Sequence, residues 1–529
     1  METSRASDRF SVAARILWAA LAALPFLSLY LAHYANPHSV PTGFIHGDMP
    51  YYSANGRAVF ERGNGWAHPN PYDPDPDAPV IYFHWFTWIL GYGIKKFGLD
   101  PGLLFAALGV VGSLACSYLT LRLVETRRPD GRDRIPLFLF TMWGGGLYCL
   151  GRAVQNLLQG RPAADSLFVY DPFDGWWFQN WGRNLIFPTE AVYHALVAGV
   201  WLAVLSRRWK LAVAATAVLA ATHPFSGLQV FLILLAWFSI LLWRERTGNL
   251  LGLWLTVVAL LALFLGYYFI FLESFPQHRS LRETWSLSWT LDSAALVLGY
   301  GPIFAIAASR VCTARSRLDA GDCFLIVSFA VSFLLAKHEC FMAPRQPLHF
   351  TRGHLWLPLC LLALPALQNV LMRARHRLAP ESFRLILLGL GMLAVSDNAA
   401  FLVRQGQNQW QNSPEAGFFL TPAERDMFTW IDSQGFDGVL LSPDAKLSYL
   451  SATYTAVRPY FGHWSETPQF RRRIGEVRAW LEEGEGGSWL AAMDYVLIAR
   501  NQVRSFHRLA GWEIAHENEE LLFLKRPAK

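Results

Sequence analysis

The feature that most constrains this chain is a run of 33 residues, 211–243, that contains no Asp, Glu, Lys or Arg. Nine further stretches have the same apolar, uncharged character, apart from a single acid, Asp397, in the last of them. They cover residues 16–34, 103–121, 135–151, 191–206, 250–272, 293–309, 323–336, 354–372 and 385–403. A helix needs roughly 20 apolar residues to cross about 30 Å of hydrocarbon. The pattern therefore predicts a polytopic α-helical membrane protein.

Residues 211–243 are too long for one crossing and short for two. Pro224 and Gly227 lie near the middle of the run, where such residues interrupt a helix. The flanking segments 207–210 and 244–246 are both basic, and basic loops favour the cytoplasmic side. A stretch with two cytoplasmic ends crosses an even number of times, so we predict two short helices joined at a turn. The predicted total is 11 transmembrane helices.

The loops between the runs alternate in length and charge. One set is short and rich in arginine, and the positive-inside rule places it, together with the N-terminus, in the cytoplasm. The opposite set is long and covers residues 35–102, 152–190, 273–292 and 337–353. Long loops build sites more often than short connectors, so we expect any site on the external face. Without a eukaryotic targeting signal, a prokaryotic inner (plasma) membrane is the expected location.

Composition supports this class and excludes others. Only 16% of the residues are charged, against about 25% in a soluble chain, so several soluble domains would lack the charge to cover them. The six cysteines form no CxxC pair or zinc-type cluster. The net charge of +6 comes from basic residues in short loops. We therefore expect membrane lipids, and not nucleic acid, as partners.

The pattern changes from about residue 404. Thr421 and Glu424 form a capping box with Pro422 at the first helical position, which predicts a helix to about Ser433. Three short strands at 438–441, 495–499 and 521–525 and a second helix at 467–480 are also predicted. We thus expect two domains: residues 1–403 form a transmembrane domain, and residues 404–529 form a small external α/β domain.

The first external loop holds the most informative motif, Gly47-Asp48-Met49-Pro50-Tyr51-Tyr52, with His46 directly before it. An amphipathic helix is predicted from Pro50 to Arg62, with Arg57 in its middle. Asp48 therefore presents an acid at the membrane surface just before this helix. Asp before Met-Pro also suits a helix N-cap, and the two roles can coexist.

An acid in a first, long external loop, many spans and a small external C-terminal domain resemble the GT-C superfamily of integral-membrane glycosyltransferases. That superfamily includes the protein O-mannosyltransferases and the lipid A aminoarabinose transferase. The resemblance covers the architecture of nearly the whole chain, but its residue-level part is mainly Gly47-Asp48 with the following Tyr/Arg helix. It implies sugar transfer from a polyprenyl-phosphate carrier to a glycan, lipid or protein acceptor, with Asp48 as general base. A single base and one direct displacement imply inversion at the anomeric carbon.

The fourth external loop is the candidate clamp for the donor phosphate. It contains Arg345, His349 and Arg352 before an apolar run, and Arg binds phosphate through two parallel hydrogen bonds. Cations on the outer side oppose the positive-inside bias, which argues against a topology signal. Snorkelling to lipid headgroups is the alternative. Arg57 and His223 are further candidates, although a His at a Pro-Gly turn is also a common structural residue.

The second external loop contains Asp171 and Asp174, three residues apart, and Glu190 at the start of a span. Two such carboxylates suit Mg²⁺ or Mn²⁺. Asp-Pro and Asp-Gly are also turn dipeptides, and Glu190 also suits the N-terminus of a helix. We carry these residues, His46 and His223 as possible metal or substrate ligands.

Two other functions compete with this prediction. A transporter would want mid-span charges and paired interrupted helices, and only Asp397 and the break at His223 fit. A polymerase or ligase of lipid-linked glycans also needs a phosphate clamp, but it does not need an acid just after the first span.

Overall fold

The computed structural model divides the chain into two compact units, each described here by itself. The helical unit comprises Met1–Leu29, Leu108–Phe264 and Leu287–Gln407, and the mixed unit comprises Tyr30–Ala107, Leu265–Ser286 and Asn408–Lys529. The structure describes residues 10–127, 133–164, 180–245, 248–284, 288–313, 318–411, 417–483, 487–502, 509 and 511–527.

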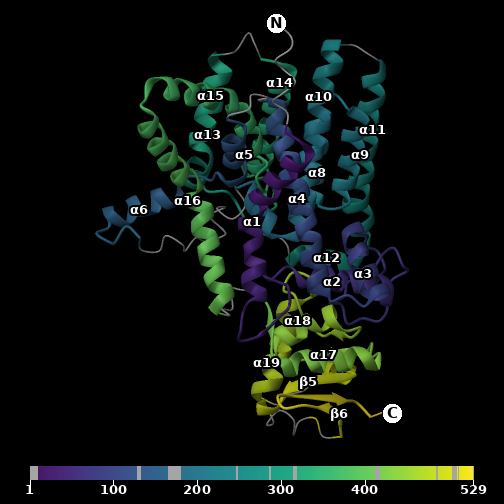
Figure 1. Cartoon of the computed structure of the whole chain (residues 1–529). Helices are drawn as coiled ribbons and strands as arrows, with labels where there is room; N and C mark the ends of the chain where they lie inside the picture. Colours follow the sequence, from purple (N-terminus) through teal and green to yellow (C-terminus); the bar gives the residue numbers. More distant parts are fainter. Residues whose placement is uncertain are drawn as a thin grey trace. The chain divides into compact units, whose positions relative to one another are not determined.

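Long apolar helices make up the helical unit (Figure 1). The helices that lie wholly or partly in it are α1 (Val12–Tyr34), α4 (Pro101–Arg127), α5 (Arg134–Trp143), α6 (Tyr148–Leu158), α8 (Pro188–Leu205), α9 (Trp209–Ala220), α10 (Pro224–Glu245), α11 (Gly248–Gly266), α13 (Ser293–Thr313), α14 (Ala320–Ala336), α15 (Trp356–Arg377) and α16 (Pro380–Gln411). Within the described ranges, eight helices are long and apolar enough to cross a membrane, or up to nine if the bent pair α5 and α6 forms one span. Helices α9 and α14 are apolar but shorter. The predicted membrane class is confirmed, whereas the count of 11 is not.

Residues 135–151 do not form the straight span that the sequence predicts. Helices α5 and α6 meet at 60° across a break at residues 144–147. The Asp397 carboxylate accepts hydrogen bonds from the backbone N–H groups of Tyr148 (3.1 Å) and Cys149 (2.9 Å) at the start of α6. A Cβ on Gly146 would lie 2.5 Å from the Leu298 carbonyl oxygen, so a side chain would not fit there. The mid-span acid therefore holds a helix break, and this contact removes one of the two features that favoured a transporter.

The two helices predicted within residues 211–243 are confirmed. Helix α9 ends at Ala220 and α10 begins at Pro224. Gly227 lets the helices approach closely, because a Cβ at this position would be 2.4 Å from Cα of Ala220.

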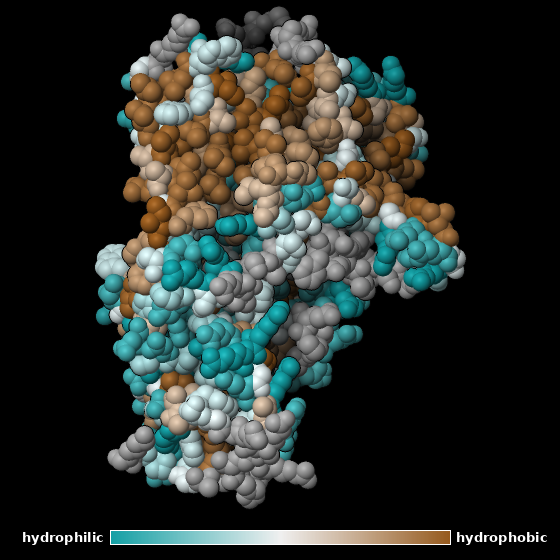
Figure 2. Space-filling view, turned by 180° about the vertical axis from the view of Figure 1, so that it is seen from behind, coloured by the Kyte–Doolittle hydropathy of each residue, from teal (hydrophilic) through white to brown (hydrophobic). Residues whose placement is uncertain are grey.

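Large apolar side chains are exposed along several helices of this unit, including Leu21 and Leu24 of α1, Leu263 of α11, and Leu385 of α16. A broad apolar surface covers part of one face of the molecule (Figure 2). Such a surface suits contact with lipid, because an apolar area of this extent is unusual on a soluble protein.

The mixed unit is built around a five-stranded sheet in the order β4-β3-β5-β7-β6, in which β3 is parallel to β4 and β5 and the other pairs are antiparallel. Its strands are β3 (Val439–Leu441), β4 (Arg458–Pro459), β5 (Tyr495–Ala499), β6 (Glu513–Glu517) and β7 (Leu521–Lys525). Its helices are α2 (Pro50–Glu61), α3 (Trp85–Phe97), α12 (Pro276–Thr284), α17 (Pro422–Gln434), α18 (Ala445–Tyr454) and α19 (Phe470–Glu483). Alternate strand residues such as Val496 and Ile498 pack with Trp480 in one apolar core.

Short-range sequence signals correctly predicted most of this sheet. The predicted strands correspond to β3, β5 and β7, and both hydrogen bonds of the predicted capping box are present at the start of α17. Strands β4 and β6 and helix α18 were not predicted.

The first long loop belongs to the same unit as this sheet. Strand β1 (Val40–Pro41) pairs antiparallel with β2 (Phe419–Leu420). The Thr42 hydroxyl donates to the Phe418 carbonyl oxygen at 2.6 Å. The chain around Asp48 is thereby tied to a segment nearly 400 residues later, so the mixed unit combines Tyr30–Ala107 of the first long loop and its flanks with Asn408–Lys529.

Candidate functional site

Asp48 lies in the turn that precedes α2. The N-cap of this helix is Met49, whose side chain makes no capping hydrogen bond. The Asp48 side chain is 55% exposed, and its Oδ1 lies 3.0 Å from Nε2 of His463. The N-cap position of α2 is thus occupied by Met49, and the Asp48 side chain instead contacts His463.

His463 links Asp48 to two further polar side chains. Nδ1 of His463 lies 2.9 Å from Oγ of Ser465, which in turn lies 3.3 Å from Oε1 of Glu466. His463 and Ser465 are buried, with 6% and 8% of their surface exposed. Burial raises the pKa of the Glu466 carboxyl, an effect that the nearby His463 and Ser465 oppose. We call these four side chains the Asp48 array.

Side chains of helix α18 form hydrogen bonds with the backbone of the turn that contains Asp48. The Tyr449 hydroxyl donates to the Gly47 carbonyl oxygen at 2.8 Å and lies 3.2 Å from the Tyr51 amide nitrogen. Thr453, one turn further, donates to the Pro50 carbonyl oxygen at 3.1 Å. These bonds hold the turn on both sides of the acid.

His46 and Arg57 lie in the same unit. Nδ1 of His46 accepts the Asp48 backbone N–H at 3.2 Å and lies 3.8 Å from Oδ2 of Asp48. Nη2 of Arg57 is paired with Glu61 at 2.7 Å and with Asp432 at 2.5 Å, and the Arg57 side chain is 8% exposed. Because two carboxylates already neutralise this guanidinium, we leave Arg57 out of the phosphate site.

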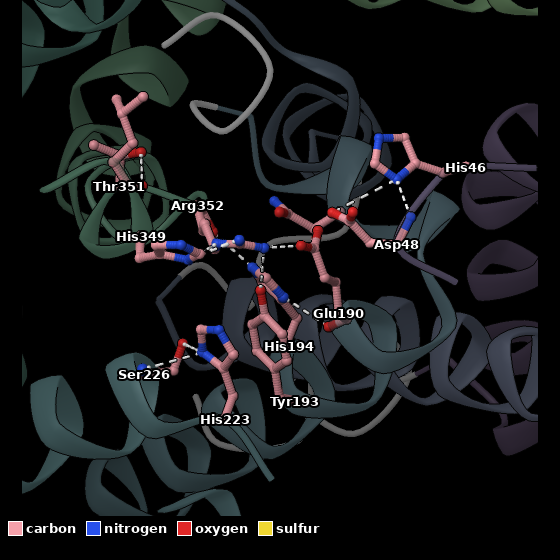
Figure 3. A network of polar contacts seen from close by, with 12 residues as sticks. His46, Asp48, Glu190, Tyr193, His194, His223, Ser226, His349, Thr351 and Arg352 are labelled. Atoms are coloured by element: carbon pink, nitrogen blue, oxygen red, sulfur yellow. Dashed lines mark hydrogen bonds and ion pairs between the residues drawn. The ribbon is translucent and has the colours of Figure 1, made fainter. Parts of the chain in front are cut away.

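A second cluster lies in the helical unit, where Arg352 sits between three side chains (Figure 3). Arg352 forms an ion pair with Glu190 on the first turn of α8. Its Nη1 donates to the Tyr193 hydroxyl at 3.0 Å, and its Nε donates to Nδ1 of His349 at 3.1 Å. Arg352 and Glu190 are each 7% exposed. Oε2 of Glu190 has no hydrogen-bond partner among the described residues.

His223 joins this Arg352 cluster from the break between α9 and α10. Its ring stacks on Tyr193, with centroids 4.4 Å apart, and lies 5.9 Å from the ring of His349. Nδ1 of His223 lies 2.9 Å from Oγ of Ser226 in the first turn of α10. His223 thus has the hydrogen bond expected of a structural residue and also lies beside the candidate phosphate ligands.

Arg345 differs from Arg352 although both come from one loop. Its side chain is exposed, and no carboxylate partner for its guanidinium is found in the part of the chain that the structure describes. Its backbone N–H donates to Nε2 of His338 at 2.8 Å, which fixes the loop. Asp171 and Asp174 lie outside the described residues. Among those that are described, no group of three His, Cys, Asp or Glu side chains is arranged to hold a metal ion.

The whole-chain architecture is similar to a solved mycobacterial enzyme, the arabinofuranosyltransferase AftD from Mycobacteria. The similarity covers 97% of this chain and 40% of AftD, with a TM-score of 0.51 and 15% sequence identity. The chain has a GT-C fold. The fold predicted from Asp48 and the arrangement of spans is therefore confirmed, and the chain spans about two fifths of the length of AftD.

Two further GT-C structures are similar at lower scores. ArnT from Cupriavidus metallidurans, solved in the apo state and bound to undecaprenyl phosphate, gives TM-scores of 0.47 and 0.45 at 13% identity, covering 97% of this chain and 98% of ArnT. The oligosaccharyltransferase AglB from Archaeoglobus fulgidus, solved with an inhibitory peptide and a dolichol-phosphate, gives 0.44 at 13% identity, covering 92% of this chain and 69% of AglB. No protein-family model matches the sequence, and no curated protein matches it significantly.

Sequence reasoning missed His463, Ser465 and Glu466. They lie in Gly462-His463-Trp464-Ser465-Glu466, a dense run of polar and aromatic residues between a strand and a helix. Such a run in a connecting segment was a usable signal, since sites concentrate in loops. What the sequence does not show is that this run reaches Asp48.

Proposed function

We propose that the protein transfers a sugar from a polyprenyl-phosphate-linked donor to an acceptor on the external face of the membrane. The observation that carries the proposal is the Asp48 carboxylate, which is more than half exposed and lies 3.0 Å from Nε2 of His463, in a chain with a GT-C fold. A carboxylate so placed contributes about 10²–10⁴-fold as a general base.

The reaction asks for one base and a stabilised leaving group. Asp48 removes the proton of the acceptor hydroxyl as its oxygen attacks the anomeric carbon. The carrier phosphate leaves from the opposite side, so the product is inverted. A phosphate leaves without a strong general acid, provided that positive groups offset the charge that develops on it.

Arg345 and the Arg352 cluster are the proposed donor site. The exposed Arg345 guanidinium supplies charge to the phosphate, the buried Arg352 supplies a second guanidinium, and the half-buried His349 lies beside it. We assign Oε2 of Glu190 to a hydroxyl of the donor sugar, because a buried carboxylate oxygen without a partner is costly unless it accepts a hydrogen bond. His46 lies beside Asp48, and His223 lies beside the Arg352 cluster.

Metal dependence is a separate question with a direct test. Two roles for Asp171 and Asp174 stay open, as ligands of Mg²⁺ or Mn²⁺ or as turn residues. Loss of transfer in EDTA that either cation restores, and that Asp171→Asn reproduces, assigns them to a metal. Transfer unchanged by EDTA assigns them to turns.

The proposed orientation puts the N-terminus in the cytoplasm and the mixed unit outside a prokaryotic inner membrane. Ser433, next to the end of α17, is exposed and suits a single cysteine in a background without the native ones. We expect an impermeant maleimide to label it in intact spheroplasts. Labelling only after lysis would reverse the orientation.

The function is tested with the purified protein and a panel of radiolabelled polyprenyl-monophosphate and -diphosphate sugars, scored for transfer or hydrolysis. We expect turnover of one donor by the wild type, about 10²-fold or more slower turnover by Asp48→Asn, and normal turnover by Asp77→Asn, which alters an exposed acid of the same loop. Growth of a diphosphate-linked glycan would indicate a polymerase or ligase. Movement of a sugar across liposomes without transfer would indicate a transporter, and either result would overturn the proposal.

A further inference from the structure

We propose that His463 is a positioning residue for Asp48: Nε2 of His463 donates to Oδ1 of the carboxylate, and Ser465 and Glu466 hold the far side of the imidazole. This inference rests on the proposed function, because it assigns the support of the base named there. It places part of the catalytic apparatus in the C-terminal segment, 415 residues after the acid.

The direction of the donors follows from counting protons. A hydroxyl carries one hydrogen, so Ser465 donates either to His463 or to Glu466. If Ser465 donates to Nδ1 of His463, the neutral imidazole carries its proton on Nε2, 3.0 Å from Oδ1 of Asp48. If Ser465 instead donates to Oε1 of Glu466, 3.3 Å away, its oxygen accepts from Nδ1–H of His463, and the imidazole carries a proton on both nitrogens. In both cases Nε2 is the donor to Oδ1 of Asp48.

The exposed fractions of the side chains indicate which member of the Asp48 array can contact a substrate. An acid, a histidine and a serine in a row also resemble a nucleophilic serine with its base. Here Ser465 is 8% exposed and hydrogen-bonded at the closed end, whereas Asp48 is 55% exposed. A buried serine does not reach a substrate. The side chain that does is the carboxylate, so the other members of the array serve Asp48.

The histidine itself is held in place by aromatic rings. Tyr449 and Tyr51 lie against the His463 ring, with centroid separations of 5.3 Å and 5.6 Å. Tyr449 also bonds the backbone of the Asp48 turn. One tyrosine therefore sets both the position of the acid's backbone and the position of the histidine that holds its side chain.

The proton balance of the step leaves His463 unchanged. The acceptor O–H bond breaks and its proton moves to the Asp48 carboxylate, while the acceptor oxygen bonds to the anomeric carbon and the bond between that carbon and the phosphate oxygen breaks. His463 keeps its Nε2 proton throughout and donates it as a hydrogen bond. Its contribution is orientation, and misplacing a reacting group by about 1 Å costs about 10²-fold.

The test compares three replacements: one removes the donor of His463, one supplies a substitute donor, and one removes the Ser465 hydroxyl. His463→Phe keeps a flat ring between the tyrosines but removes the donor, and we expect kcat to fall about tenfold or more with unchanged KM for donor and acceptor. His463→Gln places an amide N–H near the position of Nε2 and should recover most of that loss. Ser465→Ala removes the hydroxyl that fixes the tautomer, and we expect a several-fold lower kcat.

A double replacement separates positioning from fold support. If His463 acts through Asp48, His463→Phe should cost little further activity in an Asp48→Asn background, because there is no longer a base to position. Full kcat in His463→Phe, an equal loss in the Gln variant, or a fully additive loss in the double variant would each overturn the inference. If His463→Phe does not fold, the Ser465→Ala and His463→Gln variants carry the same comparison. In contrast, full activity of Asp48→Asn alone would overturn the proposed function.

Discussion

Two acids in the candidate sites, Asp48 and Glu190, are held in opposite ways. Glu190 is buried, and one of its oxygens forms an ion pair with Arg352. The Asp48 side chain is 55% exposed, and its Oδ1 lies 3.0 Å from Nε2 of His463. A carboxylate paired with a guanidinium has its charge neutralised and is a weak base. A carboxylate fixed by one hydrogen bond keeps its charge and its basicity.

The comparison separates the two tasks that a sugar transfer needs. In the Arg352 cluster the guanidinium is bound by Glu190, Tyr193 and His349, so the ion pair fixes the position of these side chains, as in a binding site. The Asp48 array has one reactive end in solvent and a buried chain of polar groups behind it. Changes at the two acids should therefore give different kinds of loss.

The largest expected effect is at Asp48. Asp48→Asn keeps the size of the side chain and an oxygen that accepts from His463, so folding should be normal while kcat falls by about 10²–10⁴-fold. Glu190→Gln keeps an acceptor for a sugar hydroxyl and should lower kcat/KM at most about tenfold. Turnover of both variants with the labelled donor is the measurement. Equal losses would remove the distinction between the two acids.

Arg352→Ala should act first on stability. It leaves the buried Glu190 without its counter-charge, and breaking such a pair costs about 3–5 kcal/mol. Replacing both residues, as Glu190→Leu with Arg352→Met, should restore most of the unfolding free energy while donor binding stays weak. Unfolding of the detergent-purified variants measures this. A wild-type melting temperature for Arg352→Ala would contradict the ion pair.

Arg345→Ala should act on binding alone. Because this guanidinium is exposed, its removal should leave stability unchanged and weaken donor binding by about 1.5–3 kcal/mol, the range for a hydrogen bond to a charged group. Arg161→Ala, at an exposed arginine of the second long loop, is the matched control. Equal donor affinities of wild type and Arg345→Ala would remove Arg345 from the clamp.

The smallest expected effect concerns Glu466. Burial raises the pKa of this carboxyl above its ordinary value of 4.5. The folded state then holds the proton more tightly than the unfolded chain, so stability falls as the pH rises from the unfolded-state pKa through the folded-state one. Glu466→Gln does not ionise, so its stability relative to wild type should increase as the pH rises above the unfolded-state pKa of Glu466. A difference independent of pH would place Glu466 in water.

Local signals account for what the sequence predicted well. The capping box at Thr421, the break before Pro224 and the helix from Pro50 depend on residues within one or two helical turns of each other. The break at residues 144–147 depends on a contact with Asp397, about 250 residues away. Residues 135–151 themselves contain no charge, so the sequence predicted one continuous span.

In the candidate site, too, features that depend on neighbouring residues were predictable, whereas contacts between residues far apart in sequence were not. The position of Asp48 in its loop was readable, because it depends on the adjacent span and helix. The partners of Arg57 and Asp48, Asp432 and His463, are 375 and 415 residues away in sequence. No pattern within either segment contains these pairings, so the sequence alone predicted neither the Asp432 partner of Arg57 nor the His463 partner of Asp48.

The pairing of β1 with β2 also sets a time at which the acid can become competent. Val40 is matched with Leu420, and a ribosome adds about 5–20 residues each second. The first loop is therefore exposed for roughly 20–80 s before its partner strand exists, and His463 follows later still. During that interval the nascent chain carries a carboxylate that nothing orients. A chain that stalls short of residue 420 would have its spans inserted while the turn at Asp48 still lacks its partner strand.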